Sequence, residues 1–164
     1  LALCALHSRW ETGSVLFRQI RIGLDGRPFM LMKFCKLRPV AEAESSTRWC
    51  IAEDERMGPV GRFLRRTSLD ELPQLWTVLK GDMSLVGPRP LPAEQVAANL
   101  ELLGPRHEVP AGVTGWWQIQ GRSDIPPDEA VRMDLFYIEN WSLALDLYVL
   151  LKTVAAVVAK RGAY

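Results

Sequence analysis

The first clear pattern of hydrophobic and polar positions predicts two β-strands. Residues 14–34 contain two β-rich runs separated by the four residues Gly23-Leu24-Asp25-Gly26. A short connector that contains glycine is typical of a β-hairpin. We therefore predict strands near residues 15–22 and 28–34. Residues 37–57 are polar without a clear period, which is typical of a loop or of a poorly ordered helix.

The middle of the chain has a helical period. One or two helical turns are expected at 60–66, where three arginines share one face: Arg62, Arg65 and Arg66. The following segment, SLDELPQLWTVLKG, predicts a helix over 68–81. Ser68 and Glu71 have the spacing of a capping box at its start, and Pro73 has to lie in or near the first turn, where a missing N–H is tolerated.

The second half of the chain alternates Gly/Pro-rich segments with apolar ones. DMSLVGPRPLP, from Asp82 to Pro92, excludes long regular structure, and a helix is expected around 92–103. A long apolar helix is expected from Trp141 to Lys160. Its apolar residues fit equally well with burial in a core and with contact to lipid. Trp116 and Trp117 fit core packing, with stacking on a ligand base as the alternative.

Composition and charge narrow the class of protein. The 164 residues are 48% apolar and 24% charged with a net charge of +1, which is typical of one globular domain and argues against a general nucleic-acid binder. Three separated cysteines without a CxxC pair indicate neither a disulfide framework nor a zinc site. No apolar run approaches the roughly 20 residues that a membrane-spanning helix needs. Because the chain begins with LALCAL, we expect an N-terminal truncation.

Asp70 and Glu71 are the first candidates for chemistry. Two adjacent carboxylates beside three arginines make a small charged site. The alternative is structural, because acidic residues stabilise the positive end of a helix. An ionised Asp needs no general base to act as a nucleophile.

Further charged residues could serve the same site. Arginine binds phosphate in a bidentate manner, and the arrangement of Arg62, Arg65, Arg66, Arg89 and Arg122 suggests a diphosphate. Each of them alone is better explained as a solvated surface charge, so only their joint arrangement indicates a ligand. Asp134 and Asp146 are further candidates, and each of them alone could also be a solvated surface charge. Asp146 is the better candidate because it lies within LALDLYVLL, where an acid needs a partner.

The ordered motifs resemble one family, the bacterial sugar transferases of the monotopic phosphoglycosyl transferase type. The resemblance covers about residues 13–164 and rests on GSVLFRQIRIG, DGRPFMLMKF, SLDELPQL, KGDMSLVGPRP, GVTGWWQIQGR and DLFYIENWSLALDL. It implies transfer of a phosphosugar from a UDP-sugar to a polyprenol phosphate, undecaprenyl phosphate, with release of UMP. This reaction initiates the synthesis of an exopolysaccharide, an O-antigen or another glycoconjugate.

The resemblance also implies roles for individual residues. Asp70 would be the nucleophile that carries the phosphosugar as an acyl phosphate, and Glu71 would bind Mg²⁺. Asp146 and Lys33 would complete the catalytic set. The substrate phosphates would be bound by three arginines: Arg65, Arg89 and Arg122.

The resemblance gives an organisation and a location as well. Residues 1–12 would be the remnant of an N-terminal membrane-associated helix and residues 13–164 the catalytic domain, at the cytoplasmic face of the bacterial inner membrane. We expect an α+β fold, a mostly helical compact domain with an N-terminal β-hairpin and an amphipathic C-terminal helix at the membrane interface. The chain departs from the family pattern at Cys35, Ala111 and Trp117, so a non-catalytic relative that binds a nucleotide sugar or a membrane partner is the alternative function.

Overall fold

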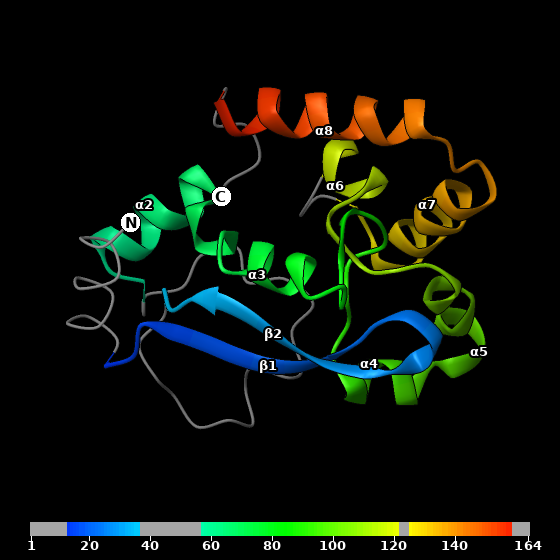
Figure 1. Cartoon of the computed structure of the whole chain (residues 1–164), viewed down its shortest axis with the longest axis horizontal. Coiled ribbons are helices and arrows are strands. Elements are labelled where there is room, and N and C mark those ends of the chain that lie inside the picture. The colour runs from blue at the N-terminus through cyan, green and yellow to red at the C-terminus, as the bar shows by residue number, and fades with distance from the viewer. Residues whose placement is uncertain (1–12, 37–56, 122–124, 159–164) are drawn as a thin grey trace.

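The computed structural model describes residues 13–36, 57–121 and 125–158. Its elements, in order, are β1 (Leu16–Ile22), the 3-10 turn η1 (Leu24–Gly26), β2 (Pro28–Phe34), α2 (Pro59–Thr67), the turn η3 (Leu69–Glu71), α3 (Gln74–Leu79), β3 (Ser84–Val86), α4 (Ala93–Ala98), α5 (Leu100–Leu103), η4 (Gly104–Glu108), β4 (Gly112–Thr114), α6 (Trp116–Gln120), α7 (Pro127–Glu139) and α8 (Leu143–Val158) (Figure 1). The mixed, mostly helical α+β class is confirmed. The expected remnant helix at 1–12, nearly all of segment 37–57 and Arg122 lie outside the described residues.

The predicted hairpin is confirmed almost to the residue. Strands β1 and β2 pair antiparallel from Leu16 opposite Phe34 to Ile22 opposite Pro28. The reversal between them uses Asp25 and Gly26, whose φ angles are +56° and +71°. Gly26 adopts this left-handed conformation without the steric cost that a side chain would add.

The expected single helix over 68–81 is divided in the structure. Ser68 has a φ of +54° and ends α2, with its N–H bonded to the carbonyls of Leu64 and Arg65. The capping-box interpretation is therefore wrong, because a residue in this conformation closes the preceding helix and its side chain caps nothing. Pro73 stands at the start of α3, as predicted.

A second, two-stranded sheet joins the two Gly-rich segments. Strand β3 runs parallel to β4, with Ser84 beside Gly112 and Val86 beside Thr114. The backbones come so close that a Cβ on Gly112 would lie 2.1 Å from the nitrogen of Gly87. The sequence excluded long regular structure from residues 82–92, and these two short strands were not predicted.

The helices pack around two small apolar clusters. One unites Leu91, Val96, Leu103 and Val131, and the other unites Val86, Tyr137 and Val149.

The expected helix at 92–103 is present but is divided into α4 and α5 at Asn99. Trp117 is buried, and the ring of Trp116 lies against Phe136 and Tyr148, which confirms their packing role.

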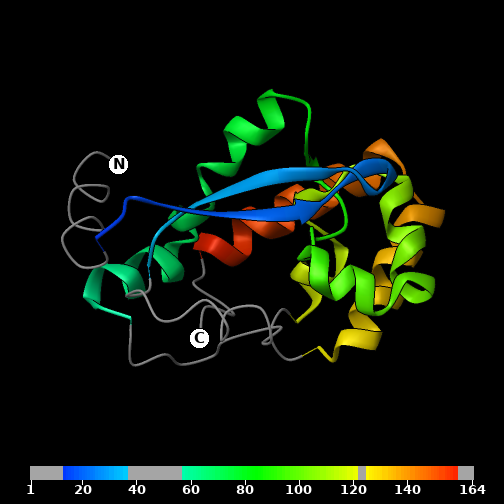
Figure 2. The same cartoon turned by 90° about the horizontal axis from the view of Figure 1, so that it is seen from below.

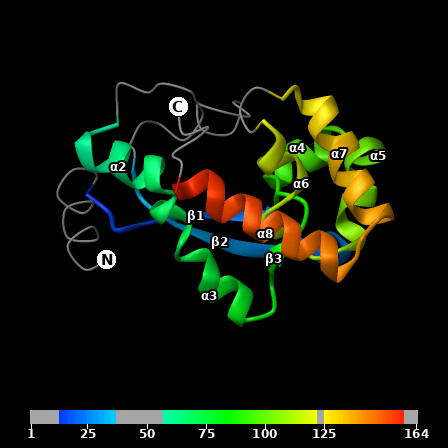
Figure 3. The same ribbon diagram turned by 90° about the horizontal axis from the view of Figure 1, so that it is seen from above.

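Helix α8 lies on the opposite side of the molecule from the β1–β2 hairpin (Figures 1, 2 and 3). The expected C-terminal helix is thus present, but of its residues only Val149 is buried. Leu143, Leu147, Leu151, Val154 and Val158 are all more than half exposed. Burial in a core therefore does not explain the apolar composition of this helix. Within the described ranges, no helix is long and apolar enough to cross a bilayer.

Candidate functional site

The acidic pair lies in the short turn η3, where α2 ends and before α3 begins. Asp70 is almost completely buried, at 3% exposure. The Nζ of Lys36, two residues beyond the end of β2, lies 2.6 Å from Asp70 Oδ2. A buried carboxylate requires such a partner, because an isolated charge is costly away from water.

Glu71 is held by two cations from different parts of the chain. Lys33 on β2 places its Nζ 2.8 Å from Glu71 Oε1, and the Arg89 Nη1 lies 3.6 Å from the same oxygen. Burial opposes ionisation of Glu71, but Lys33 and Arg89 outweigh it and lower its pKa from 4.5 to about 2. Glu71 therefore carries a full negative charge at neutral pH. The side chain that was expected to cap a helix is committed to this ion pair instead.

The cations of this site outnumber the carboxylates. Lys33, Lys36 and Arg89 face Asp70 and Glu71, so three positive charges meet two negative ones and leave a local excess of +1. Burial, with the opposing effect of Glu71, lowers the pKa of Lys33 from 10.5 to about 8. A nearly buried site with excess positive charge is suited to a phosphate group.

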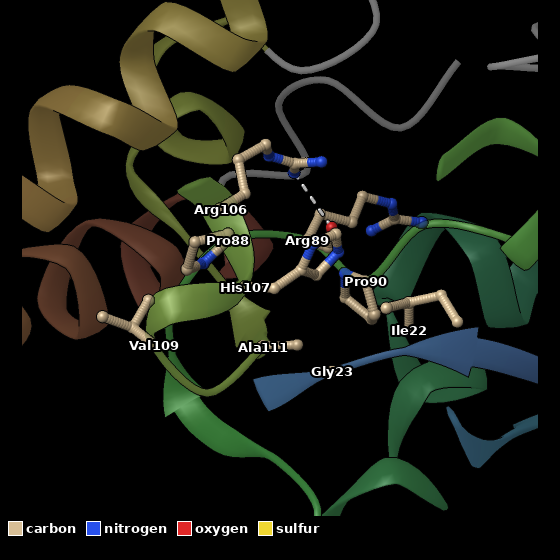
Figure 4. Close-up of a pocket in the computed structure, with 9 residues that line it drawn as sticks. All are labelled: Ile22, Gly23, Pro88, Arg89, Pro90, Arg106, His107, Val109 and Ala111. Atoms are coloured by element: carbon tan, nitrogen blue, oxygen red, sulfur yellow. Dashed lines mark hydrogen bonds between the residues drawn. The ribbon is translucent and has the colours of Figure 1, made fainter. Parts of the chain in front are cut away.

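The segment that carries Arg89 borders a small cavity (Figure 4). The end of β1, the Pro88-Arg89-Pro90 segment and η4 line it. His107 is among the lining residues, and partial burial lowers its pKa.

One lining residue of this cavity, Arg106, belongs to a buried ion pair. Arg106 Nε donates to Asp134 Oδ2 at 2.9 Å, and both side chains are about 2% exposed or less. The interpretation of Asp134 as a solvated surface charge is therefore wrong. Burial raises the pKa of Asp134 to about 6 even against the effect of Arg106, and its carboxyl is still ionised at neutral pH.

Asp146 lies elsewhere, on α8. Its Oδ1 accepts a hydrogen bond from the Tyr137 hydroxyl at 2.7 Å, and its Oδ2 accepts one from Trp141 Nε1 at 3.3 Å. It also lines a hollow between the end of α3, β3 and α8. Among the described residues, no hydrogen bond or ion pair connects Asp146 with the acidic pair. The structure thus gives it the partner that the sequence demanded, and that partner lies outside the Asp70 and Glu71 cluster.

The structure unites Lys33, Asp70, Glu71 and Arg89, and it adds residues that the sequence interpretation missed. Lys36 was missed although it follows Lys33 by three positions. Arg106 carried no signal in the sequence. Arg65 is half-buried on α2, and its guanidinium has no hydrogen-bond or ion-pair partner in the described part of the chain. Arg122, the third predicted phosphate ligand, falls in the undescribed segment 122–124.

The site offers a divalent cation two carboxylates. No group of three or more His, Cys, Asp or Glu side chains is arranged to hold a metal ion within the described ranges. Mg²⁺ usually keeps several waters and uses one or two carboxylates together with substrate phosphates. The ionised Glu71, with Asp70 beside it, fits that pattern.

Comparisons with known proteins agree on one family. The family model described as bacterial sugar transferase matches residues 1–160. The uncharacterized sugar transferase EpsL of Bacillus subtilis is 44% identical over 155 residues, covering 94% of this chain and 75% of that protein. The exopolysaccharide production protein ExoY of Sinorhizobium fredii is 38% identical, over 94% of this chain and 74% of that protein.

A longer relative is similar over the same region. The UDP-glucose:undecaprenyl-phosphate glucose-1-phosphate transferase of Escherichia coli is 41% identical over 160 residues, which cover 93% of this chain. This chain spans only 34% of the length of that protein. The similarity therefore concerns one region of the longer protein and most of the two shorter ones.

Proposed function

Because this chain belongs to the bacterial sugar transferase family, we propose that it transfers a sugar phosphate from a UDP-sugar to undecaprenyl phosphate. The name of the Escherichia coli relative supports these substrates, and the name of ExoY supports a role in exopolysaccharide production. One observation in this chain carries the proposal. Asp70 and Glu71 lie on one turn, Asp70 almost completely buried, and Lys33, Lys36 and Arg89 pair with them.

Asp70 is the nucleophile in this proposal. A carboxylate oxygen of Asp70 attacks the phosphorus that bears the sugar, the bond to the bridging oxygen breaks, and UMP leaves with that electron pair. An oxygen of undecaprenyl phosphate then attacks the same phosphorus and releases the Asp70 carboxylate. Two successive displacements at one enzyme group predict ping-pong kinetics.

The lysine on Asp70 has a role in the first step. Lys36 lies 2.6 Å from Oδ2 of the carboxylate, and it neutralises a charge that passes to the phosphoryl oxygens as the acyl phosphate forms. The flexible stem of a lysine allows its ammonium to follow that charge. Stabilising developing charge is the main contribution of protein groups to phosphoryl transfer.

Glu71 is proposed as the residue that binds Mg²⁺. Lys33 and Arg89 keep it ionised and oriented, and Arg89 is also placed to contact a substrate phosphate. When bound, the metal ion supplies positive charge against the diphosphate of the donor.

We propose further that the molecule binds the cytoplasmic face of the inner membrane through α8 and α3. The exposed apolar residues of α8 lie next to a hollow that is lined by α8 and by the end of α3. Helix α3 adds Leu75, Trp76 and Leu79, of which Leu79 is 79% exposed. A patch of this kind marks an interaction surface, and an undecaprenyl substrate resides in a membrane.

Intact-mass spectrometry tests the proposed reaction. The chain is incubated with Mg²⁺ and a panel of UDP-sugars, without the lipid acceptor. We expect a phosphosugar adduct on the wild-type protein and none on Asp70→Asn. Asp82→Asn is the matched control, since Asp82 is an exposed aspartate that follows α3, and it should form the adduct normally.

Exchange of radiolabelled UMP into the UDP-sugar provides the second measurement. An adduct that still forms on Asp70→Asn would contradict the assignment of Asp70 as the nucleophile. If no UDP-sugar gives either an adduct or UMP exchange, the proposed transferase activity is contradicted. Binding of a UDP-sugar by calorimetry without turnover would then identify the chain as a non-catalytic relative.

A further inference from the structure

The segment from Pro88 to Leu91 is held to the rest of the molecule through its carbonyl groups. Pro88 and Pro90 have no backbone N–H, so the segment cannot form an ordinary two-sided ladder of hydrogen bonds. Instead, four consecutive carbonyls accept hydrogen bonds from outside the segment. The donors are Gly112 N to Pro88 O (2.9 Å), Arg106 Nη2 to Arg89 O (3.0 Å), Arg21 Nη1 to Pro90 O (3.1 Å) and Ile22 N to Leu91 O (3.1 Å).

We propose that Arg106 and Arg21 are positioning residues that hold the backbone of Arg89 so that its side chain meets Glu71. This inference rests on the proposed function, in which Arg89 and Glu71 belong to the phosphate site. The two guanidinium groups act through adjacent carbonyls, at Arg89 and at Pro90. Neither of them makes a hydrogen bond or ion pair with Asp70 or Glu71 among the described residues.

Arg106 is itself held in place by Asp134. The Nε and Nη2 of Arg106 both donate to Oδ2 of Asp134, and Nη2 also donates to the Arg89 carbonyl. Figure 4 shows the Arg106 guanidinium above the Arg89 backbone, with the hydrogen bond between them dashed. Both members of the ion pair are buried. The planar guanidinium therefore has a fixed orientation, which a lysine ammonium would not reproduce.

Arg21 supports the neighbouring carbonyl from β1. Its Nη2 donates to Gln19 Oε1 at 2.6 Å, which leaves Nη1 directed at Pro90 O. The next residue along the strand, Ile22, donates its N–H to Leu91 O. Burial and the nearby charge of Arg89 lower the pKa of Arg21 to about 10. The hairpin thus fixes one side of the segment, and η4 with α7 fixes the other.

Arg106→Lys is the main test variant. It keeps a cation for Asp134 but removes the rigid fork that joins Asp134 to the Arg89 carbonyl. A displacement of about 1 Å can reduce a reaction rate by up to about 100-fold, so we expect UMP exchange to fall about 10- to 100-fold. Arg132→Lys, at an exposed arginine of α7, is the matched control and should exchange normally.

A double-mutant cycle separates positioning from a general structural effect. If Arg106 acts through Arg89, then Arg106→Lys should lower exchange no more than about twofold further in an Arg89→Gln background. Arg21→Lys should give the same pattern from the other side, and it serves as the test if Arg106→Lys does not fold. The inference would be overturned if Arg106→Lys and Arg21→Lys each lowered UMP exchange by the same factor in the Arg89→Gln background as in the wild-type background.

Amide hydrogen exchange gives a readout that does not depend on the reaction. The N–H groups of Ile22 and Gly112 donate to this segment and should exchange at least about tenfold faster in Arg106→Lys. The N–H of Cys35, which bonds to the carbonyl of Val15 3.0 Å away, is the internal control. Unchanged exchange at Ile22 and Gly112 would overturn the inference. If the wild-type protein forms no adduct but Arg106→Lys still shows this selective acceleration, the bracing is supported and only the proposed function is contradicted.

Discussion

Replacing Glu71 by Gln tests the electrostatics of the site through protein stability. Glu71 has its pKa lowered from 4.5 to about 2 by Lys33 and Arg89, and only 24% of its side chain is exposed. The difference between these pKa values corresponds to about 3 kcal/mol of free energy of unfolding, since each factor of ten in the proton equilibrium is worth about 1.4 kcal/mol.

The direction follows from which state holds the proton. Because the folded state has the lower pKa, ionised Glu71 stabilises the protein above pH 4.5, and this stabilisation is lost as the pH falls toward about 2. A glutamine resembles the protonated acid and cannot titrate. Wild-type and Glu71→Gln should therefore differ most in stability at neutral pH and converge near pH 2.

Urea unfolding between pH 7 and pH 2 measures this effect. We expect the difference in free energy of unfolding between the two proteins to shrink by about 3 kcal/mol across this range. Other carboxyl groups titrate in both proteins and cancel in the difference. Glu139→Gln, at an exposed glutamate of α7, is the control and should follow the wild-type curve. A wild-type minus Glu71→Gln difference that is constant with pH would refute the assigned pKa and its cause.

Three further predictions concern other parts of the molecule. Gly112→Ala should destabilise the protein by about 3 kcal/mol or more in urea unfolding, because the new Cβ would meet backbone atoms of Gly87 that cannot move aside. Gly104→Ala is the control and should not destabilise the protein, because a Cβ there meets nothing within 4 Å. Tyr137→Phe should cost about 1–2 kcal/mol through loss of the hydroxyl bond to Asp146, and thermal melts that match wild-type would contradict that bond. Leu151→Glu should weaken sedimentation with anionic lipid vesicles severalfold without changing the melting temperature, because Leu151 is 72% exposed on α8; unchanged sedimentation would argue against the proposed membrane-facing surface.

The sequence by itself determined the features that depend on neighbouring residues. The Gly-bearing connector and the flanking β-rich runs were enough to predict the β1–β2 hairpin, since turn conformation is a local property. The helical period likewise predicted α2 and α8. The same local rules failed at Ser68, where two helices meet and a single residue serves as the end of the first.

Only the tertiary structure decided which distant residues meet. Lys33 and Lys36 are 38 and 34 positions from their carboxylate partners, and Arg106 is 28 positions from Asp134. Hydrophobic periodicity carries no information about such pairs, because it records which face of an element is buried and not which element covers it.

The acidic pair illustrates this division. Its residues and its arginine-rich surroundings were visible in the sequence, but the spacing alone left both a helix cap and a reactive site open and favoured the cap. Folding brings β2 and the Arg89 segment against the turn η3, so that Lys33 and Arg89 hold Glu71 and Lys36 holds Asp70. A buried carboxylate has to be paired with a cation, and the identity of that cation is fixed by the packing of the whole domain.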